Sequence, residues 1–159
     1  MEPNSLRFSV ADAQDSVPSV ATPQGYLSGA RSLMPGQKVL AAAPNQTECT
    51  AALMLLSGQI LEGLLKALLL KAGLTEQELK ELKKENVRHN LSALWAWAAT
   101  KGLPVSPTLP DWVETLNGLH NCPFHLRYPK GLLVLVQSNA QQMTSKLEQL
   151  IEMVARELG

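Results

Sequence analysis

The most chemically suggestive residues are two histidines at the ends of the stretch His120–His125, which reads His-Asn-Cys-Pro-Phe-His. Two imidazoles at this spacing can serve as general acid and general base on an RNA 2′-hydroxyl and its leaving 5′-oxygen. Arg127 and Lys130 follow, and both can hold a phosphate by charge-assisted hydrogen bonds. The stretch allows three interpretations: catalysis by His120, His125 and Arg127, ligand binding without catalysis, or a surface turn with no function.

The same stretch also contains side chains that can bind zinc. Zinc accepts imidazole and thiolate ligands, which His120, Cys122 and His125 supply. Structural zinc sites carry paired ligands on both sides of a loop, and a fourth ligand at a recognisable spacing is missing from this sequence. We therefore predict no metal site, and we predict no cofactor.

A second candidate site lies at Arg88-His89-Asn90, where Asn90 is placed to cap a helix that begins with Leu91. The free backbone N–H groups and the dipole of a helix N-terminus attract anions. We predict that Arg88, His89 and Asn90 contact a phosphate or a carboxylate. The alternative is structural, because a His-Asn pair can simply close off the backbone donors at the start of the helix.

Charge and composition predict an ordinary intracellular domain. The chain has 159 residues, 14 Lys+Arg against 14 Asp+Glu, and 45% hydrophobic residues. Balanced charge argues against a surface that binds nucleic acid all over, so only a local basic patch can do so. The two cysteines are far apart, and residues 1–22 lack the regions of a signal peptide. Both features predict a cytoplasmic protein with free thiols.

The most apolar stretch, residues 53–70, is interrupted by Gln59, Glu62 and Lys66. Charged side chains are costly in a bilayer, so we predict a buried core helix and no membrane span. Glu62 and Lys66 form an i,i+4 pair in the favourable order, and each is expected to neutralise the other at the edge of the core. An ionisable pair in so apolar a helix also often lines a cleft or an interface.

The elements that must position these residues are all predicted to be helical. Residues 1–22 show no lasting periodicity and are expected to form a flexible arm, whereas residues 23–159 form one helical bundle. Capping residues, glycines and prolines set the predicted helix ends, including a capping box from Thr75 to Glu78 and a left-handed Gly73 after Ala72. The predicted helices are Gly25 to Met34, stopped by Pro35-Gly36; Thr47 to Ala72; Thr75 to about Glu85; Asn90 to Gly102; Pro110 to about His120; and Ser138 to Leu158.

Two details of the packing can also be predicted. Trp95 and Trp97 are two positions apart on one helix and cannot share a face, so one is expected in the core and the other at a rim. The predicted buried stripe of the helix after Pro110 consists of Trp112, Leu116 and Leu119. The run from Leu126 to Val136 fits either an extended segment or the start of the last helix.

Three passages resemble the HEPN superfamily of helical domains. Leu61 to Leu69, with Glu62, Lys66 and Ala67, is similar to the family's Glu-x-x-x-Lys-Ala helix. Arg88-His89-Asn90-Leu91 is similar to its Gly-His-Asp-Leu step, with Arg and Asn in place of Gly and Asp. Leu126-Arg127-Tyr128-Pro129 is similar to its Arg-Tyr-Pro after a later helix. The similarity spans about Tyr26 to Leu158.

This resemblance implies a four-to-five-helix bundle that pairs as a homodimer. The superfamily includes metal-independent RNA endonucleases of toxin–antitoxin and anti-phage systems, and also non-catalytic members that bind a nucleotide or a partner protein. The nucleases carry an Arg followed after four to six residues by a His, and no Arg of this sequence satisfies that motif. The scaffold is therefore expected without the nuclease chemistry.

The preferred interpretation is a HEPN-like module that binds RNA, a nucleotide or a partner protein without nuclease activity. Its ligand-binding residues are expected to be Arg88, His89, Asn90, His125, Arg127, Tyr128 and Lys130. The alternative is a divergent metal-independent endoribonuclease, in which His120 and His125 are acid and base and Arg127 holds the phosphate. Whether the chain is an enzyme stays open at this point.

Overall fold

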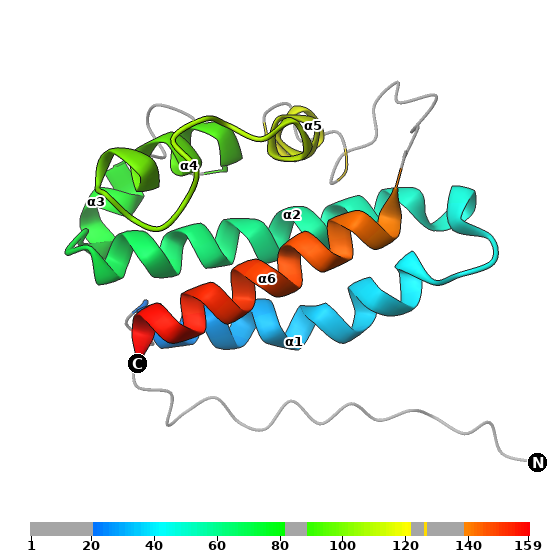
Figure 1. Cartoon of the computed structure of the whole chain (residues 1–159), viewed down its shortest axis with the longest axis horizontal. Helices are drawn as coiled ribbons and strands as arrows, with labels where there is room; N and C mark the ends of the chain where they lie inside the picture. Colours follow the sequence, from blue (N-terminus) through cyan, green and yellow to red (C-terminus); the bar gives the residue numbers. More distant parts are fainter. Residues whose placement is uncertain (1–20, 82–88, 122–125, 127–138) are drawn as a thin grey trace, which may run out of the picture.

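The fold is seen in a computed structural model that describes residues 21–81, 89–121, 126 and 139–159, except for the side chains of Gln46 and Lys80. The described residues form six helices and their connections (Figure 1). The helices are α1 (Pro23–Ala41), α2 (Gln46–Lys71), α3 (Glu76–Glu81), α4 (Leu91–Thr100), α5 (Asp111–His120) and α6 (Ala140–Leu158). The predicted all-α class is confirmed, and these six helices correspond to the six predicted ranges, whereas the HEPN resemblance implies four or five; α3 has only 6 residues.

The other helices pack on two sides of α2, with α1 and α6 on one side and α4 and α5 on the other. The long helices α1, α2 and α6 lie side by side, with α1 antiparallel to the other two (Figure 1). The short helices α4 and α5 contact the opposite side of α2 and also each other. Since α2 is covered on both sides, it is the central helix of the bundle.

The interior of α2 is almost entirely apolar, as its sequence predicts. Leu61, Leu64, Leu65 and Leu68 are each at most 1% exposed. From Thr47 to Lys71 the helix is long and apolar enough to cross a membrane by length and composition, and 72% of its most apolar stretch is buried against the rest of the chain. Its apolar character is thus used to build the core of this bundle.

The end predicted for the first helix is wrong, because α1 continues through Pro35 to Ala41. A proline inside a helix costs about 3 kcal/mol, since it removes one backbone hydrogen bond and crowds the preceding turn. Here Pro35 is exposed, whereas Gln37 and Ala41 beyond it are fully buried. The packing of this second half of α1 against α2 and α6 offsets the local cost of the proline.

Gln37 connects the three long helices through buried hydrogen bonds. Its Oε1 accepts from the hydroxyl of Thr144 on α6 at 3.1 Å, and its Nε2 donates to Ser57 Oγ on α2 at 3.4 Å. We expect Thr144→Val to lower the free energy of unfolding by about 1–3 kcal/mol, because a buried acceptor loses its partner. Urea denaturation followed by circular dichroism measures the change. Thr115→Val on the exposed side of α5 is the matched control, expected to change stability by at most about 0.5 kcal/mol.

Local capping signals fix most of the other helix ends. Asn90 Oδ1 accepts from Ala93 N at 2.9 Å and caps α4, and Gly73 has the positive φ of 94° expected after α2. The predicted cap at Thr47 is wrong, because α2 already begins at Gln46. Asn139 caps α6 by accepting from Gln142 N. Ser138 and the run 127–136 lie outside the described residues.

Thr75 and Glu78 form the predicted capping box. The hydroxyl of Thr75 accepts from Glu78 N at 3.1 Å, and the Glu78 carboxylate accepts from Thr75 N at 2.7 Å. The hydrogen bonds that the Thr75 backbone N–H and then its hydroxyl donate to the carboxylate hold the pKa of Glu78 below its usual value. Because the ionised carboxylate makes the bonds, the box is intact above that pKa and is lost as the pH falls through it.

We expect Thr75→Ala to raise the pKa of Glu78 part of the way to its usual value. The substitution removes the hydroxyl that donates to the carboxylate at 2.9 Å and leaves the backbone donor in place. NMR titration of the Glu78 side-chain carboxyl measures the pKa directly. Thr108→Ala, a substitution in the exposed connection before α5, should leave this titration unchanged; an unaltered midpoint in Thr75→Ala would contradict the assignment of the box.

The face of α5 that packs inward differs from the predicted stripe. Val113, Leu116 and His120 are buried, whereas Trp112 and Leu119 are only half-buried. Trp112 instead packs edge-on against Trp95, with ring centroids 6.2 Å apart. Trp95 is the buried tryptophan of its helix and Trp97 is half-buried, as predicted. The rotation of α5 turns His120 towards α2.

Candidate functional site

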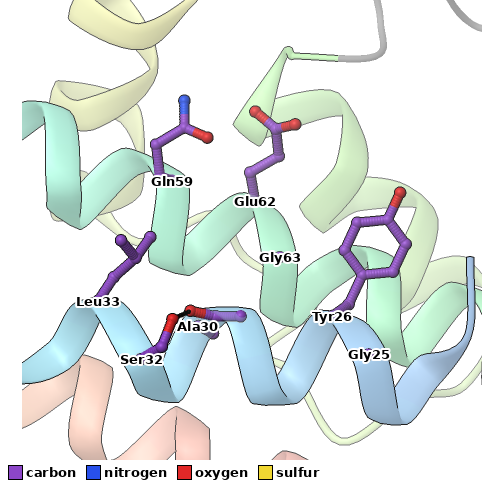
Figure 2. A pocket seen from close by; sticks show the side chains of 9 residues that line it. Gly25, Tyr26, Ala30, Ser32, Leu33, Gln59, Glu62 and Gly63 are labelled. Carbon is purple, nitrogen blue, oxygen red and sulfur yellow. Dashed lines mark hydrogen bonds between the residues drawn. The ribbon is translucent and has the colours of Figure 1, made fainter. Parts of the chain in front are cut away.

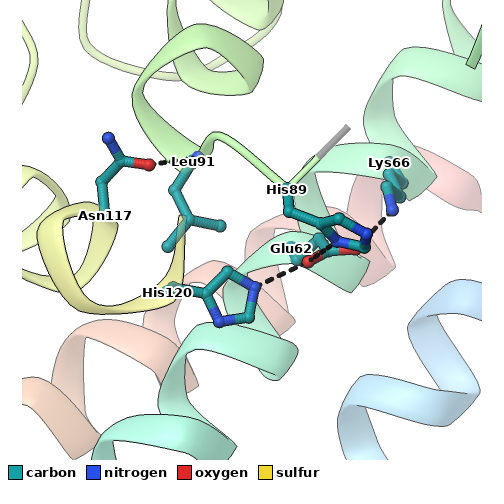
Figure 3. Close-up of polar contacts among 6 residues, drawn as sticks. All are labelled: Glu62, Lys66, His89, Leu91, Asn117 and His120. Carbon is teal, nitrogen blue, oxygen red and sulfur yellow. Dashed lines mark hydrogen bonds and ion pairs between the residues drawn. The ribbon is translucent and has the colours of Figure 1, made fainter. Parts of the chain in front are cut away.

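A buried carboxylate is the centre of the candidate site. Glu62 on α2 is bonded to three other side chains, Lys66, His89 and His120 (Figure 3). His120 Nε2 lies 2.7 Å from Glu62 Oε2, and His89 Nδ1 lies 3.0 Å from the same oxygen. The Lys66 ammonium pairs with Glu62 Oε1 one helical turn further along α2. These four side chains are called the Glu62 cluster below.

The start of α4 and the end of α5 bring the two histidines to Glu62. His89 directly precedes the cap residue of α4, and His120 is the last residue of α5. Asn117, one turn before His120, accepts a hydrogen bond from Leu91 N at 2.7 Å (Figure 3). This bond satisfies a backbone donor at the start of α4 and ties α4 to α5, so the two histidines are held over α2 together.

Gly58 makes room for the ring of His120. It lies one turn before Glu62 on α2, and a Cβ built there would come within 2.4 Å of His120 Nδ1 and 2.9 Å of its Cγ. Atoms of real side chains do not approach this closely, so only glycine lets the imidazole lie against the backbone of α2. The position of the ring thus depends on a glycine inside a helix, where glycine is otherwise unfavourable.

Glu62 is ionised in spite of its burial. Burial alone raises the pKa of its carboxyl, but the hydrogen bonds from His120 and His89 and the positive charge of Lys66 outweigh that effect. The pKa of Glu62 therefore lies far below the usual value for glutamate. An ionised carboxylate only accepts hydrogen bonds, so Nδ1 of His89 and Nε2 of His120 are its donors.

One atom of the cluster has its hydrogen-bonding capacity unused. The side chain of His120 is fully buried, and its Nδ1 has no hydrogen-bond partner among the described residues. Asn121 Oδ1, in the next residue, is likewise buried without a partner there. Buried polar atoms without partners are uncommon in folded proteins and often coincide with sites of function.

The Glu62 cluster adjoins a groove between α1 and α2 with a volume of about 310 Å³ (Figure 2). Tyr26 and Leu33 line it from α1, and Gln59, Glu62 and Gly63 from α2. The ammonium of Lys66 lies 5.9 Å from the centre of the Tyr26 ring, within the range of a cation–π contact. The groove therefore connects a half-buried aromatic ring to the charged cluster.

The cluster also contains a set of metal-ligand types. Ligand atoms of Glu62, His89 and His120 all lie within 4.8 Å of one another. A carboxylate and two imidazoles are ligands that zinc and related ions accept. Cys122 and His125, two of the residues considered for zinc from the sequence, lie outside the described residues.

The structure brings together His89 and His120, two residues that the sequence placed in separate candidate sites. Asn90 caps α4, as the structural alternative for Arg88-His89-Asn90 proposed. The interpretation of His120 as part of a surface turn is wrong, because it ends α5 and is buried. Five predicted site residues lie outside the described residues: Arg88, His125, Arg127, Tyr128 and Lys130.

The central role of Glu62 and the contributions of Gly58 and Tyr26 are not among the features predicted from the sequence. A signal was present, because an ionisable pair in an apolar helix and an isolated glycine four residues before it indicate a close approach by another element. The spacing of residues does not reveal which element makes this approach. In the structure it is α5, which packs on α2.

Comparisons with known proteins give no relative for this chain: no family model, no curated protein and no solved structure matches it. The HEPN resemblance therefore stays a prediction from the three sequence passages. The all-α bundle and the Glu62 cluster stand on the structure itself.

Proposed function

We propose that the chain is a HEPN-like binding module without nuclease activity, which receives the base of a nucleotide or an unpaired RNA base in the groove between α1 and α2. The observation that carries this proposal is the groove itself, which has a volume of about 310 Å³ and runs from the Tyr26 ring to the Glu62 cluster. Ligand sites in proteins begin at about 300 Å³, so the groove suits one small planar group.

The chemistry of the lining supports a base as that group. The ring of Tyr26 provides a surface on which any base can stack. The amide of Gln59 has both a donor and an acceptor, which can read the edge of a base. The described residues that line the groove include neither Lys nor Arg, so the groove suits the base rather than the phosphate.

The endoribonuclease alternative has less support. Its proposed catalytic base or acid, His120, has a fully buried side chain whose Nε2 is bonded to Glu62. An imidazole in that position does not meet the 2′-hydroxyl of an RNA strand at the surface. The other two residues of this alternative, His125 and Arg127, lie outside the described residues, and their roles stay predictions.

Calorimetric titration with nucleoside monophosphates and with short single-stranded RNA tests the proposal. We expect binding that Gln59→Ala weakens about 5- to 30-fold, the effect of losing one or two hydrogen bonds. Tighter binding of RNA than of any monophosphate would assign the base to an RNA strand; the reverse order would assign it to a free nucleotide. No binding of either, by a folded protein, would overturn the proposal.

A matched pair of variants on α1 locates the site. Gly29 lines the groove and a Cβ there would meet no atom within 4 Å, so Gly29→Gln is expected to obstruct ligand entry and abolish binding. Ser28→Gln introduces the same side chain at the exposed neighbouring position, outside the lining, and should bind like the wild type. Equal binding by both variants would contradict this location.

Two further experiments address the rest of the proposal. RNA incubated with the protein in excess EDTA should stay intact; cleavage that His120→Ala abolishes would favour the endoribonuclease instead.

The homodimer implied by the HEPN resemblance predicts twice the monomer mass in light scattering after size-exclusion chromatography. A monomer that binds the ligand would remove the dimer from the proposal and leave the groove.

A further inference from the structure

We propose that Glu62, His89 and His120 bind a divalent transition-metal ion of the zinc class. The proposal goes beyond the binding of a base in the groove and does not depend on it. Its basis is the convergence of three ligand atoms, supplied by α2, by the residue before the cap of α4 and by the end of α5, within 4.8 Å of one another. A carboxylate with two imidazoles is a donor set that tetrahedral zinc sites use, with the fourth position open.

The distances within the cluster are close to those that an ion needs. Ligand atoms about 2.0–2.2 Å from a tetrahedral ion are roughly 3.4 Å from one another. His120 Nε2 and His89 Nδ1 lie 2.7 and 3.0 Å from Glu62 Oε2. The His120 contact therefore needs to open by about 0.7 Å and the His89 contact by about 0.4 Å, while the two histidine nitrogens already lie within 4.8 Å of each other.

Glu62 has two carboxylate oxygens, so one can pair with Lys66 while the other binds a metal ion. Lys66 pairs with Oε1, whereas the shortest histidine contact is to Oε2. Coordination through Oε2 leaves the Lys66–Oε1 pair in place as an outer hydrogen bond of the kind that orients metal-binding carboxylates. The positive charge of Lys66 still opposes a cation, so its removal should strengthen binding.

The hydrogen-bonding state of the two ring nitrogens of His120 also fits a role as a metal ligand. Coordination through Nε2 moves the ring proton to Nδ1, which has no partner among the described residues. Asn121 Oδ1, in the next residue and likewise without a partner among the described residues, is an acceptor of the type that such an N–H requires. Entry is provided at His89, whose side chain is 24% exposed, while Glu62 and His120 are buried.

The test uses the untagged full-length chain, stripped with EDTA and then titrated with Zn²⁺ against a chromophoric chelator. We expect one Zn²⁺ per chain, and we expect the visible spectrum of tetrahedral Co²⁺ when Co²⁺ replaces it. His89→Ala and His120→Ala should each weaken binding about 100-fold or more, since each removes a ligand. Lys66→Met should bind Zn²⁺ more tightly than the wild type.

Matched controls separate this site from adventitious binding and from misfolding. Cys49→Ser removes the half-buried free thiol of α2 and should leave Zn²⁺ affinity unchanged. Circular dichroism confirms the fold of each variant, and His89→Ala decides the outcome if His120→Ala does not fold, because His89 lies in a half-exposed connection. No stoichiometric Zn²⁺ in the wild type, or equal affinity in a folded His89→Ala, overturns the proposal.

Discussion

Gly58→Ala should destabilise the protein by about 2 kcal/mol, although alanine normally stabilises a helix interior relative to glycine by about 0.5–1 kcal/mol. The added Cβ would come within 2.4 Å of His120 Nδ1, on a ring that is fully buried. Forcing an atom into a packed interior costs about 1–3 kcal/mol, and displacing the ring also strains its hydrogen bond to Glu62. Urea denaturation followed by circular dichroism measures the change.

Gly118→Ala provides the comparison for this substitution. Gly118 lies on α5, two residues before His120, and a Cβ there would meet no atom within 4 Å. The same change should therefore be neutral or stabilise the protein by up to about 1 kcal/mol. If Gly58→Ala were as stable as Gly118→Ala, the close packing of His120 on α2 would be wrong.

Glu62→Gln should lower the free energy of unfolding by about 3 kcal/mol or more. Glutamine has nearly the same shape but no charge, so Lys66, whose side chain is only 4% exposed, loses the counter-ion of its ammonium group in the interior. Removing one partner of a buried ion pair typically costs about 3–5 kcal/mol, because the other charge remains buried and uncompensated. The hydrogen bonds from His89 and His120 are weakened at the same time.

The partner charge can be removed to test this explanation. Glu62→Gln combined with Lys66→Met should recover much of the lost stability, since neither buried charge then remains unpaired. Glu157→Gln is the matched single variant: it breaks the exposed pair with Lys71, whose atoms are 3.4 Å apart, and should cost at most about 1 kcal/mol. A double variant no more stable than Glu62→Gln alone would refute the uncompensated charge as the cause.

Sequence-based prediction succeeded where the determining contacts are local. The cap at Asn90, the box between Thr75 and Glu78 and the left-handed Gly73 each depend on residues within one turn, and each is present. Met143, Leu147, Ile151 and Val154 recur at helical spacing in the last helix, and all four are buried. Local interactions therefore made the all-α fold class and most helix boundaries predictable from the sequence.

Prediction failed where contacts between residues far apart in the sequence decide the structure. Pro35 is tolerated because Gln37 and Ala41 are buried against other helices, and no residue near Pro35 signals this. The sequence predicts a helix that ends near His120 and leaves a surface turn as one interpretation of this residue, whereas its burial comes from the packing of α5 on α2. The Glu62 cluster joins residues 58 positions apart in the chain, a separation that spacing rules do not address.

The hydrogen bond from Leu91 N to Asn117 Oδ1 has a consequence for the way the molecule opens. Because it joins the first residue of α4 to the last turn of α5, neither helix can detach alone from α2 without breaking this bond and leaving the Leu91 N–H on α4 and the Asn117 Oδ1 on α5 without each other. Local opening on this side of α2 therefore involves both helices at once. In amide hydrogen exchange, α4 and α5 would lose protection as a single cooperative unit, and both histidines would leave Glu62 in the same event.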